Sequence, residues 1–379
     1  MNPFNYIFTG GGASALILAY RMIHDLFFND KSILMIESSE KNTNDRTWCF
    51  WEKGKGEWDD ILEKSWDKVS FKSNVYSENL SIAPYSYKMI RSSRLYRTVL
   101  DQLRERKNIT ILSDQVIDIK QDKLGATVHT LNGTYQTEKV INSIPFDQRY
   151  KSQQKFPLLQ QHFLGWFIET KEACFDDSQP ILMDFTVAQK DHTRFMYILP
   201  ESPYRALLEY TLFSKTLLTN EEYETEIKNY LTKKGITNYT ITEKEQGVIP
   251  MTAYQFWKHN SEHLIKIGTA GGWSKASTGY TFMNIIKRTK DLTEFLKTEK
   301  SFKKFHKTKK FWFYDLLLLD VLSKYNHFGA QIFGLLFKRN SIQQIFKFLD
   351  EETNFWEDIK IMIGMPPLKF MRALIKRLF

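Results

Sequence analysis

Cysteine is scarce in this sequence, which has 379 residues and only two cysteines, Cys49 and Cys174. Because the two lie far apart, they form neither the closely spaced pairs of a zinc or redox site nor a disulfide framework. We therefore expect no metal site and a reduced, cytoplasmic protein in which both cysteines are small apolar residues. Repeats and low-complexity segments are also missing, and the 42% hydrophobic content suffices for two packed cores.

Long hydrophobic runs are missing as well. A helix that crosses a membrane needs roughly 18 consecutive apolar residues, and the best candidate, Phe311 to Leu322, is shorter and contains Asp315 and Asp320. No basic segment precedes the first predicted strand, which starts at about residue 4, so we expect no secretory signal. The sequence thus predicts a protein that does not cross a membrane.

Positive charges exceed negative charges by nine, and most of the excess lies near the C-terminus. Residues 300–379 contain fifteen Lys and Arg against seven Asp and Glu, so the preceding 299 residues are close to neutral. This segment interleaves basic residues with aromatic and aliphatic ones, a pattern that favours docking on an anionic partner. No nucleic-acid-binding module accompanies the charge, which makes nucleic acid a poor candidate.

A glycine turn follows the first predicted strand, Asn5 to Thr9. The spacing Gly10-x-Gly12-x-x-Ala15 leads into a helical pattern and then into a second strand that ends at Glu37. In a dinucleotide-binding βαβ unit, the first glycine makes the turn and the second lets the pyrophosphate approach the backbone. The small third residue allows helix and strand to pack closely, and the terminal acid accepts from ribose hydroxyls. The pattern therefore predicts dinucleotide contacts at all four residues, with a purely structural turn as the alternative.

A second glycine cluster makes FAD the predicted dinucleotide rather than NAD. Gly268-Thr269-Ala270-Gly271-Gly272 follows a predicted strand, Leu264 to Ile267, more than 250 residues after the first turn. Flavoproteins of this architecture return the chain in this way to cover the isoalloxazine ring, with a following helix, here from Phe282, whose N-terminus points at the flavin. Arg91 lies where related flavoproteins place a basic contact, with an ordinary helix-end arginine as the alternative. The further predicted cofactor contacts are Arg91, Gly268, Gly271, Gly272 and Gly279.

Between Phe163 and Thr252 the hydrophobic pattern changes to alternation with short turns, which indicates an antiparallel sheet. The predicted fold class is α/β, with a Rossmann-type FAD-binding domain, an inserted antiparallel β-sheet substrate domain and a mostly helical C-terminal region. The predicted boundaries are 1–150 and 245–299, 151–244, and 300–379. Residues 41–57 are predicted as a loop, and residues 91–106 as a helix.

Several segments resemble one family when they are read in their order along the chain. They are Asp45-Arg46-Thr47-Trp48-Cys49-Phe50-Trp51, Leu207-Leu208-Glu209-Tyr210-Thr211, Gly247-Val248-Ile249-Pro250-Met251, and residues 182–185, 194–200 and 268–280. With the glycine turn they span residues 5 to 282, and the sequence is similar to the lycopene cyclase family of carotenoid-modifying flavoproteins. Two positions depart from that family: Tyr210 stands where a second acid often follows the catalytic glutamate, and Ala276 stands where proline is common. The first departure counts against a mechanism that needs paired carboxylates at this motif.

The resemblance implies protonation of a terminal alkene of lycopene, ring closure on the carbocation and loss of a proton, with no net transfer of electrons. Glu209 matches the catalytic carboxylate, and burial favours the protonated form of a carboxyl near neutral pH. From the strand pattern alone, a glutamate on the solvated face is the alternative. In this family reduced FAD stabilises the positive charge, and NAD(P)H acts only as the external reductant.

Asp184 and Arg194 flank Glu209 in the predicted sheet. We predict that both assist catalysis, Asp184 by a hydrogen bond near the flavin or the substrate end, while a structural ion pair between them is the alternative. The ring of Tyr197 could face the cation, although an aromatic residue of the core would look the same in the sequence.

The predicted function is therefore FAD-dependent lycopene β-cyclisation, an isomerisation that forms β-carotene through γ-carotene, on the cytoplasmic side of the cell membrane. Because a polyene hydrocarbon dissolves in the bilayer, the basic amphipathic segments 300–312 and 368–378 are predicted to dock on an anionic membrane surface. A solvated run of charge is the alternative for these segments. An FAD-dependent monooxygenase or reductase acting on another hydrophobic substrate is the alternative enzyme, and a flavin-binding interaction protein is the non-enzymatic alternative.

Overall fold

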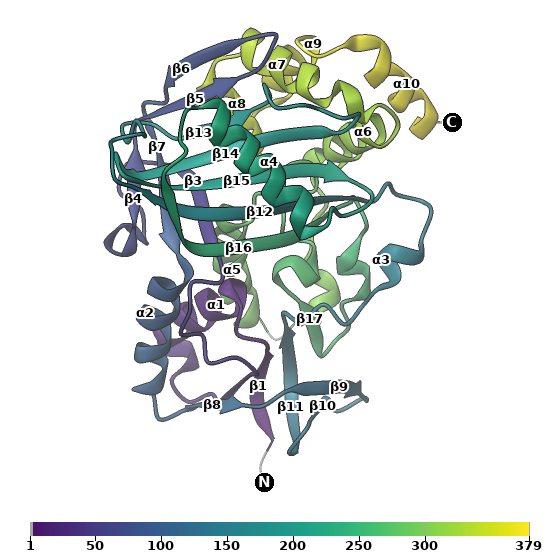
Figure 1. The fold of residues 1–379 in the computed structure, drawn as a ribbon. Helices are drawn as coiled ribbons and strands as arrows, with labels where there is room; N and C mark the ends of the chain where they lie inside the picture. The colour runs from purple at the N-terminus through teal and green to yellow at the C-terminus, as the bar shows by residue number, and fades with distance from the viewer. Residues whose placement is uncertain (1–2, 299, 379) are drawn as a thin grey trace.

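The computed structural model describes residues 3–298 and 300–378. Two sheets dominate the ribbon (Figure 1): the first lies near the N-terminus with α1 and α2 beside it, and the second lies above it in the same view. The C-terminal helices gather beyond the second sheet, at the end of the molecule opposite the N-terminus (Figure 1). The functional site depends on how these two sheets meet.

The first sheet has the strand order β8-β2-β1-β11-β10-β9, with β17 beside β11. Strands β8, β2, β1, β11 and β17 run parallel, whereas β9, β10 and β11 are joined antiparallel. The strands are β1 (Phe4–Thr9), β2 (Ile33–Glu37), β8 (Ile109–Ser113), β9 (Val116–Gln121), β10 (Ala126–Thr130), β11 (Thr134–Asn142) and β17 (Leu264–Lys266). Helices that pack together on this sheet are α1 (Ala13–Ile23), α2 (Ser92–Arg104) and α5 (Phe282–Leu296).

The second sheet has the order β16-β12-β15-β14-β13-β5-β6. All neighbours are antiparallel except β13 and β5, which are parallel. Its strands are β5 (Lys68–Lys72), β6 (Ser77–Ser81), β12 (Leu159–Thr170), β13 (Ile181–Asp184), β14 (Thr193–Ser202), β15 (Arg205–Ser214) and β16 (Tyr239–Met251). Because successive side chains along a strand point to opposite faces, each strand contributes residues to both faces of this sheet.

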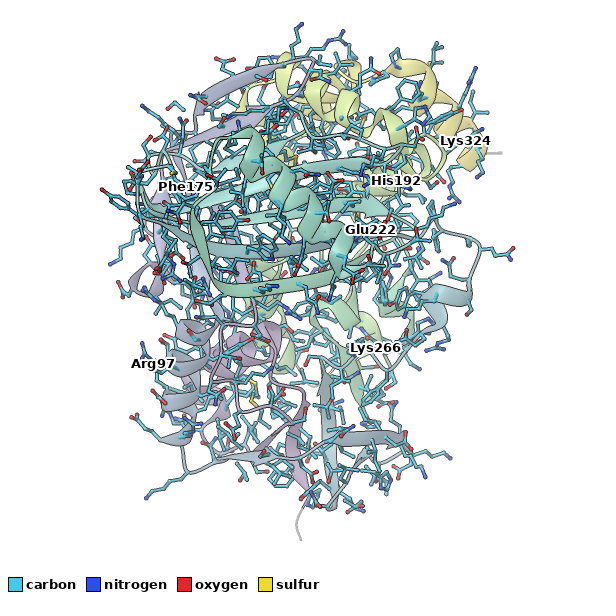
Figure 2. The ribbon with its side chains drawn as sticks, viewed as in Figure 1. Arg97, Phe175, His192, Glu222, Lys266 and Lys324 are labelled. Atoms are coloured by element: carbon cyan, nitrogen blue, oxygen red, sulfur yellow. The ribbon has the colours of Figure 1, made fainter. Side chains whose placement is uncertain are left out.

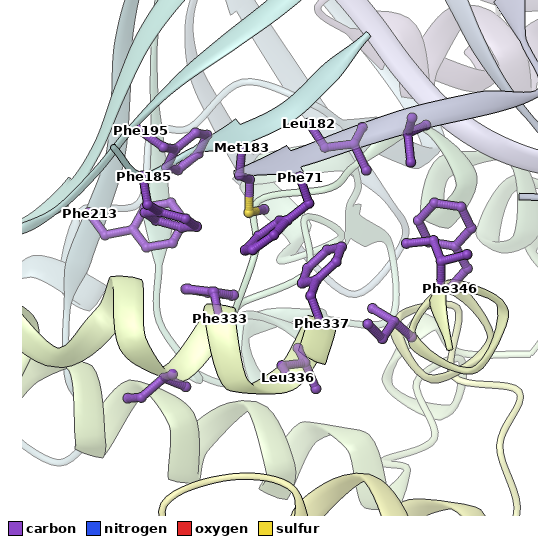
Figure 3. Close-up of a cluster of buried hydrophobic side chains, with 14 of the residues drawn as sticks. Phe71, Leu182, Met183, Phe185, Phe195, Phe213, Phe333, Leu336, Phe337 and Phe346 are labelled. Atoms are coloured by element: carbon purple, nitrogen blue, oxygen red, sulfur yellow. The ribbon is translucent and has the colours of Figure 1, made fainter. Parts of the chain in front are cut away.

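Helices cover both faces of the second sheet. One face packs against α4 (Asn220–Lys233), which begins with a capping box between Thr219 and Glu222, the latter labelled on its helix in Figure 2. The other face packs against C-terminal helices, where Phe333 and Phe337 of α7 stack on Phe185 and Phe71 (Figure 3). The C-terminal helices are α6 (Lys310–Lys324), α7 (Gly329–Arg339), α8 (Ile342–Leu349), α9 (Phe355–Ile363) and α10 (Pro367–Leu378).

A small third sheet, with the order β3-β7-β4, joins the two larger ones. Its strands are β3 (Thr47–Lys53), β4 (Lys64–Trp66) and β7 (Tyr85–Arg91). The remaining short helices are α3 (Arg149–Ser152) and the 3-10 turns Leu26–Phe28, Asp59–Ile61, Phe256–His259, Gly268–Gly271, Phe302–Lys304 and Asn326–Phe328.

The predicted fold class is confirmed: strands β12 to β16 are inserted between β11 and β17 of the first sheet. The observed sheets differ from the predicted boundaries, because β5 and β6 join the second sheet and β16 crosses residue 245. The predicted loop is wrong for residues 47–53, since pairing with β7 makes them a strand. That pairing also ends β7 at Arg91, so the predicted helix begins at Ser92. Within the described residues, no helix is long and apolar enough to cross a membrane.

Candidate active site

A cavity of about 600 Å³ lies between the first and second sheets. One end is lined by the glycine turn and Glu37, and the other by Tyr197, Glu209 and Glu245 of the second sheet. The predicted dinucleotide site and the predicted catalytic carboxyl therefore open into the same space. The wall at the second sheet is apolar and is formed by Phe163, Leu182, Met183, Phe195, Leu207 and Phe213.

The turn after β1 leaves room at the start of α1. Gly10 has a φ of +86°, and a Cβ there would lie 2.5 Å from Ser143 Oγ, so the position requires glycine. A Cβ at Gly12 would meet nothing within 4 Å, because this position faces the cavity. Among the residues that the structure describes, no side chain caps the helix at Gly12, so its first amides are available to an anion. Ala15 is fully buried behind the turn and permits the close packing of helix and strand.

Glu37 ends β2 with its carboxylate held in place. Oε2 accepts from the Gly11 amide, and Oε1 accepts from the amide and hydroxyl of Ser39 at 2.9 and 2.8 Å. Burial alone would raise the pKa of Glu37, but these donors and Lys41 outweigh it and lower the pKa below its ordinary value. An ionised carboxylate at the cavity wall suits acceptance from ribose hydroxyls.

The second glycine cluster approaches the first. Gly268 has a φ of +59°, and a Cβ there would lie 2.5 Å from Ser14 Oγ in the first turn of α1. Gly268 and Gly279 line the cavity, as do Thr269 and Thr278. Gly271 and Gly272 do not: a Cβ on Gly271 would meet the Lys266 carbonyl oxygen, and one on Gly272 would meet Phe256. The cluster thus divides into cavity-lining residues and residues that only shape the turn.

Arg91 lies away from the cavity. Its guanidinium pairs with Glu243, lies 3.6 Å from Glu201, and stacks 3.8 Å from the centre of the Phe167 ring. The residue immediately precedes α2, so the helix-end alternative describes its position. The geometry gives no support to the predicted cofactor contact, because two partly exposed acids of the second sheet take up this charge.

Glu209 faces the cavity from β15. Its side chain is buried, with 8% of the residue exposed, and Oε1 accepts from the Thr211 hydroxyl at 2.7 Å. Burial, together with the charge of Glu245, raises the pKa of Glu209 to about 8, although the Thr211 hydrogen bond lowers it. Glu209 is therefore mainly protonated at neutral pH, which places a proton donor against an apolar wall.

Three phenols and a thiol surround this end of the cavity. The hydroxyls of Tyr87 and Tyr197 lie 2.6 Å apart, and Tyr280 and Cys49 line the same space. Burial raises the pKa of all four groups, so they remain neutral. Sequence reasoning found only Tyr197, because Tyr87 and Tyr280 belong to separate segments that the fold brings together.

Asp184 and Arg194 lie on the opposite face of the second sheet. Asp184 Oδ1 accepts from the amide and hydroxyl of Thr186 at 3.0 and 2.5 Å, and Oδ2 accepts from the Tyr230 hydroxyl of α4 at 2.8 Å. Arg194 donates to the Tyr210 hydroxyl at 3.3 Å. Within the described residues the two form no ion pair with each other, and neither lines the cavity. The register of the strands explains this, because Asp184 pairs with Met196, which packs on the α4 face, and Phe195, next to Arg194, takes the cavity side.

Glu245 of β16 is a cavity residue that sequence reasoning missed. It is buried, with 8% exposed, and Oε2 accepts from the Thr47 hydroxyl at 2.7 Å. The only signal in the sequence is Gly165, since a glycine inside a strand marks a close approach of other groups. Gly165 alone does not show which residues approach it, because that depends on how the strands pair.

Comparison with known proteins agrees with the resemblance of the motifs. A family model described as lycopene cyclase protein matches residues 5–375. A lycopene beta-cyclase of a Paracoccus species is 32% identical over 126 residues, which cover 32% of this chain and 32% of that protein. The lycopene beta-cyclase of Pseudescherichia vulneris is 25% identical over 288 residues, covering 73% of this chain and 69% of that protein. The match with the Paracoccus protein thus spans about a third of its length.

The fold also resembles solved structures. A flavoprotein/dehydrogenase from Cytophaga hutchinsonii has a TM-score of 0.62 at 10% identity, covering 100% of this chain and 99% of that one. At this identity the likeness concerns the fold, in agreement with the Rossmann-type first sheet. The family model, in contrast, covers almost every residue of the sequence, and the chain belongs to the lycopene cyclase family.

Proposed function

We propose that this protein is an FAD-dependent lycopene β-cyclase, which closes the ψ-ends of lycopene into β-rings. One observation carries the proposal: Glu209, a buried carboxyl whose pKa is raised to about 8, faces the same cavity as the glycine turn. The relatives from Paracoccus and Pseudescherichia vulneris bear the same activity in their names.

The dinucleotide end of the cavity fits FAD. The uncapped start of α1, the open position at Gly12 and the ionised Glu37 provide places for a pyrophosphate and a ribose. When bound in its reduced form, with NAD(P)H as the external reductant, FAD would supply negative charge beside the substrate end. Gly268 and Gly279 line the stretch of cavity between α1 and the second sheet, where a flavin ring would lie.

The protein's own residues supply the proton and the dry surroundings. The Glu209 carboxyl gives its proton to the terminal double bond, and the resulting cation closes the ring by forming one carbon–carbon bond. A proton leaving the new ring then returns to the Glu209 carboxylate, so atoms and electrons balance and the product is an isomer. Leu182, Phe195 and Leu207 keep water away from the cation, and the phenol rings of Tyr87, Tyr197 and Tyr280 provide faces that attract it.

Expression in lycopene-accumulating cells tests this proposal. We expect lycopene to be replaced by β-carotene, with γ-carotene as the intermediate. The purified protein should convert lycopene without consuming stoichiometric NAD(P)H or oxygen, which separates a cyclase from a monooxygenase or reductase. Unchanged lycopene in cells that contain folded, flavin-loaded protein would overturn the proposal.

The outer surface of the last two helices supports docking on a membrane, the place where a polyene substrate is dissolved. Leu368, Met371, Ile375 and Leu378 of α10 are between 54 and 71% exposed, and their spacing puts them on one stripe of the helix. Phe355, Trp356 and Ile363 of α9 are also exposed. The stripe is accompanied by Lys369, Arg372 and Lys376, whereas Arg377 pairs with Asp320. We propose that this surface docks peripherally on an anionic membrane, on its cytoplasmic side.

Flotation with lipid vesicles tests this surface. The variant Met371→Ser/Ile375→Ser should lose most of its binding to vesicles that contain phosphatidylglycerol and keep its thermal stability. The matched control Ile117→Ser/Leu131→Ser changes two exposed apolar residues near β9 and β10, far from α10 (Figure 1), and should bind like the wild type. Equal binding by both variants would remove α10 from the proposal.

A further inference from the structure

Two buried glutamates lie in one row of the second sheet. Gly165 of β12 pairs with Glu209 of β15 on one side and with Glu245 of β16 on the other. Residues directly opposite one another in a sheet point to the same face, so both carboxyl groups project into the cavity. Their Cα atoms are two strand spacings apart, about 10 Å.

Glycine between them brings the side chains close to one another. A Cβ at Gly165 would lie 2.9 Å from Leu207 Cδ1, 3.4 Å from Glu245 Cγ and 3.5 Å from Glu209 Cβ. Any larger residue would stand between the two glutamates or push them apart. The absence of a side chain at Gly165 therefore lets Leu207 and the side chains of both glutamates come together over β12.

The surroundings of the two carboxyls differ. Glu245 accepts from the Thr47 hydroxyl at 2.7 Å, and the positive charges of Arg46 and Arg91 act on it more strongly than the negative charge of Glu243. Glu209 has the Thr211 hydroxyl as its hydrogen-bond donor, with neutral Tyr197, Tyr280 and Cys49 nearby. When two neighbouring carboxyls share one site, the one with more positive charge around it ionises first and the other keeps its proton.

The second carboxylate expected at the catalytic motif is thus supplied by a different strand. Tyr210 occupies the position after Glu209, and its side chain points to the α4 face, where it meets Arg194. An acid at position 210 would point the same way and would not reach the cavity. Glu245, two strands from Glu209, does line it.

We propose that Glu245 is a positioning residue of this active site: in its ionised form it holds the proton on Glu209 until substrate takes it. This role rests on the proposed cyclase function. It supplies a second carboxyl to the active site, although Tyr210 replaces the second acid that often follows the catalytic glutamate. Glu245 acts on the proton of Glu209 through the space beside Gly165, and Thr47 fixes its carboxylate.

The electrostatics agree in direction with this arrangement. The charge of Glu245 is the main cause, after burial, that raises the pKa of Glu209 to about 8. Burial also holds the pKa of Glu245 above its ordinary value, and Thr47, Arg91 and Arg46 limit that rise. A donor with a pKa near the working pH combines a high protonated fraction with sufficient acid strength.

The pH profile of lycopene cyclisation by Glu245→Gln tests the proposal. We expect the basic limb of the profile to move to lower pH by roughly 1–2 units, the size of interaction between nearby charges in a protein. Activity should fall several-fold at pH 8 and recover at pH 6, because acid restores the proton to Glu209. Thermal unfolding of the flavin-loaded proteins gives a second readout. The wild type should lose stability as the pH rises from 6 to 8, and Glu245→Gln should lose less over the same range.

Two further variants keep the test decisive. Thr47→Val removes only the hydroxyl that holds Glu245 and should shift the basic limb in the same direction by less. Glu169→Gln removes an exposed carboxylate of β12 outside the cavity and should leave the profile unchanged. If the wild type cyclises lycopene and the pH profiles of Glu245→Gln and Thr47→Val are both unshifted, the role of Glu245 is overturned and the cyclase function stands. If the wild type leaves lycopene unchanged, the cyclase function itself is overturned. If Glu245→Gln does not fold, the Thr47→Val profile decides.

Discussion

The two faces of the second sheet hold buried polar groups in opposite ways. On the α4 face, the carboxylate of Asp184 accepts three hydrogen bonds, from Thr186 and Tyr230. On the cavity face, the hydrogen-bond donor to Glu209 is Thr211, and another carboxyl, Glu245, lies in the same row. A buried carboxylate with several donors stabilises a fold, while a buried carboxyl beside a like charge and without a nearby cation keeps its proton.

This difference separates structural from reactive groups more reliably than residue type does. Asp184, Arg194 and Glu209 have similar places in their sequence motifs, and all three are buried. Only Glu209 faces open space that also reaches the dinucleotide end of the cavity. Whether a strand residue belongs to the site therefore depends on the face of the sheet to which its side chain points.

The largest expected effect is the loss of cyclisation in Glu209→Gln. Removing the proton donor while keeping its shape should lower kcat by at least about 100-fold, the contribution of a positioned general acid. The variant should still bind flavin, because Glu209 lies at the other end of the cavity from the glycine turn. Single-turnover kinetics with lycopene in vesicles measures this, and near wild-type turnover would remove Glu209 from the mechanism.

On the α4 face, Asp184→Asn should affect stability instead of chemistry. Replacing an acceptor of three hydrogen bonds by an amide should lower the free energy of unfolding by about 1–3 kcal/mol. The kcat of the folded fraction should stay within about twofold of the wild type, since Asp184 does not line the cavity. A large loss of kcat at unchanged stability would reverse the comparison between the two faces and restore the catalytic role predicted from the sequence.

Burial of a protonated Glu209 should also appear in the dependence of stability on pH. Its pKa rises from 4.5 in the unfolded chain to about 8 in the fold. The contribution of the neutral carboxyl is therefore complete below pH 4.5 and is lost as the pH rises through 8. Between pH 5 and 8 the free energy of unfolding, measured with urea, should fall by about 1–3 kcal/mol more for the wild type than for Glu209→Gln. Parallel curves for the two proteins would mean that Glu209 is not buried in neutral form.

The smallest effect is expected at Tyr197. Tyr197→Phe keeps the ring that lines the cavity and removes the hydroxyl that lies 2.6 Å from that of Tyr87. We expect the kcat of Tyr197→Phe to fall only a few-fold. Tyr197→Leu removes the ring, and its kcat should fall further because a cation–π contact contributes about 0.5–2 kcal/mol. Equal activity of the two variants would show that the ring does not act on the cation.

Local patterns in the sequence predicted most of the fold and about half of the site. The glycine turn, Glu37, Gly268 and Gly279 line one cavity, as local strand, turn and helix signals indicated, whereas Glu209 was assigned by the resemblance of its motif and not by the strand pattern. Asp184 and Arg194 were predicted to act beside Glu209, but they lie on the other face of the sheet. Side chains alternate along β14, so Arg194 points away from the cavity that Phe195 and Tyr197 face. Arg91 and Glu245 depend on pairing between distant strands, which a local pattern does not determine.

The protonation state of Glu209 can be measured directly by infrared difference spectroscopy. The wild type and Glu209→Gln are compared at pH 7, both without flavin so that its carbonyl bands do not interfere. We predict a protonated carboxyl band that is present in the wild type, is missing from the variant and disappears as the pH rises through about 8. A difference spectrum with carboxylate bands alone at pH 7 would contradict a neutral acid at the centre of this site.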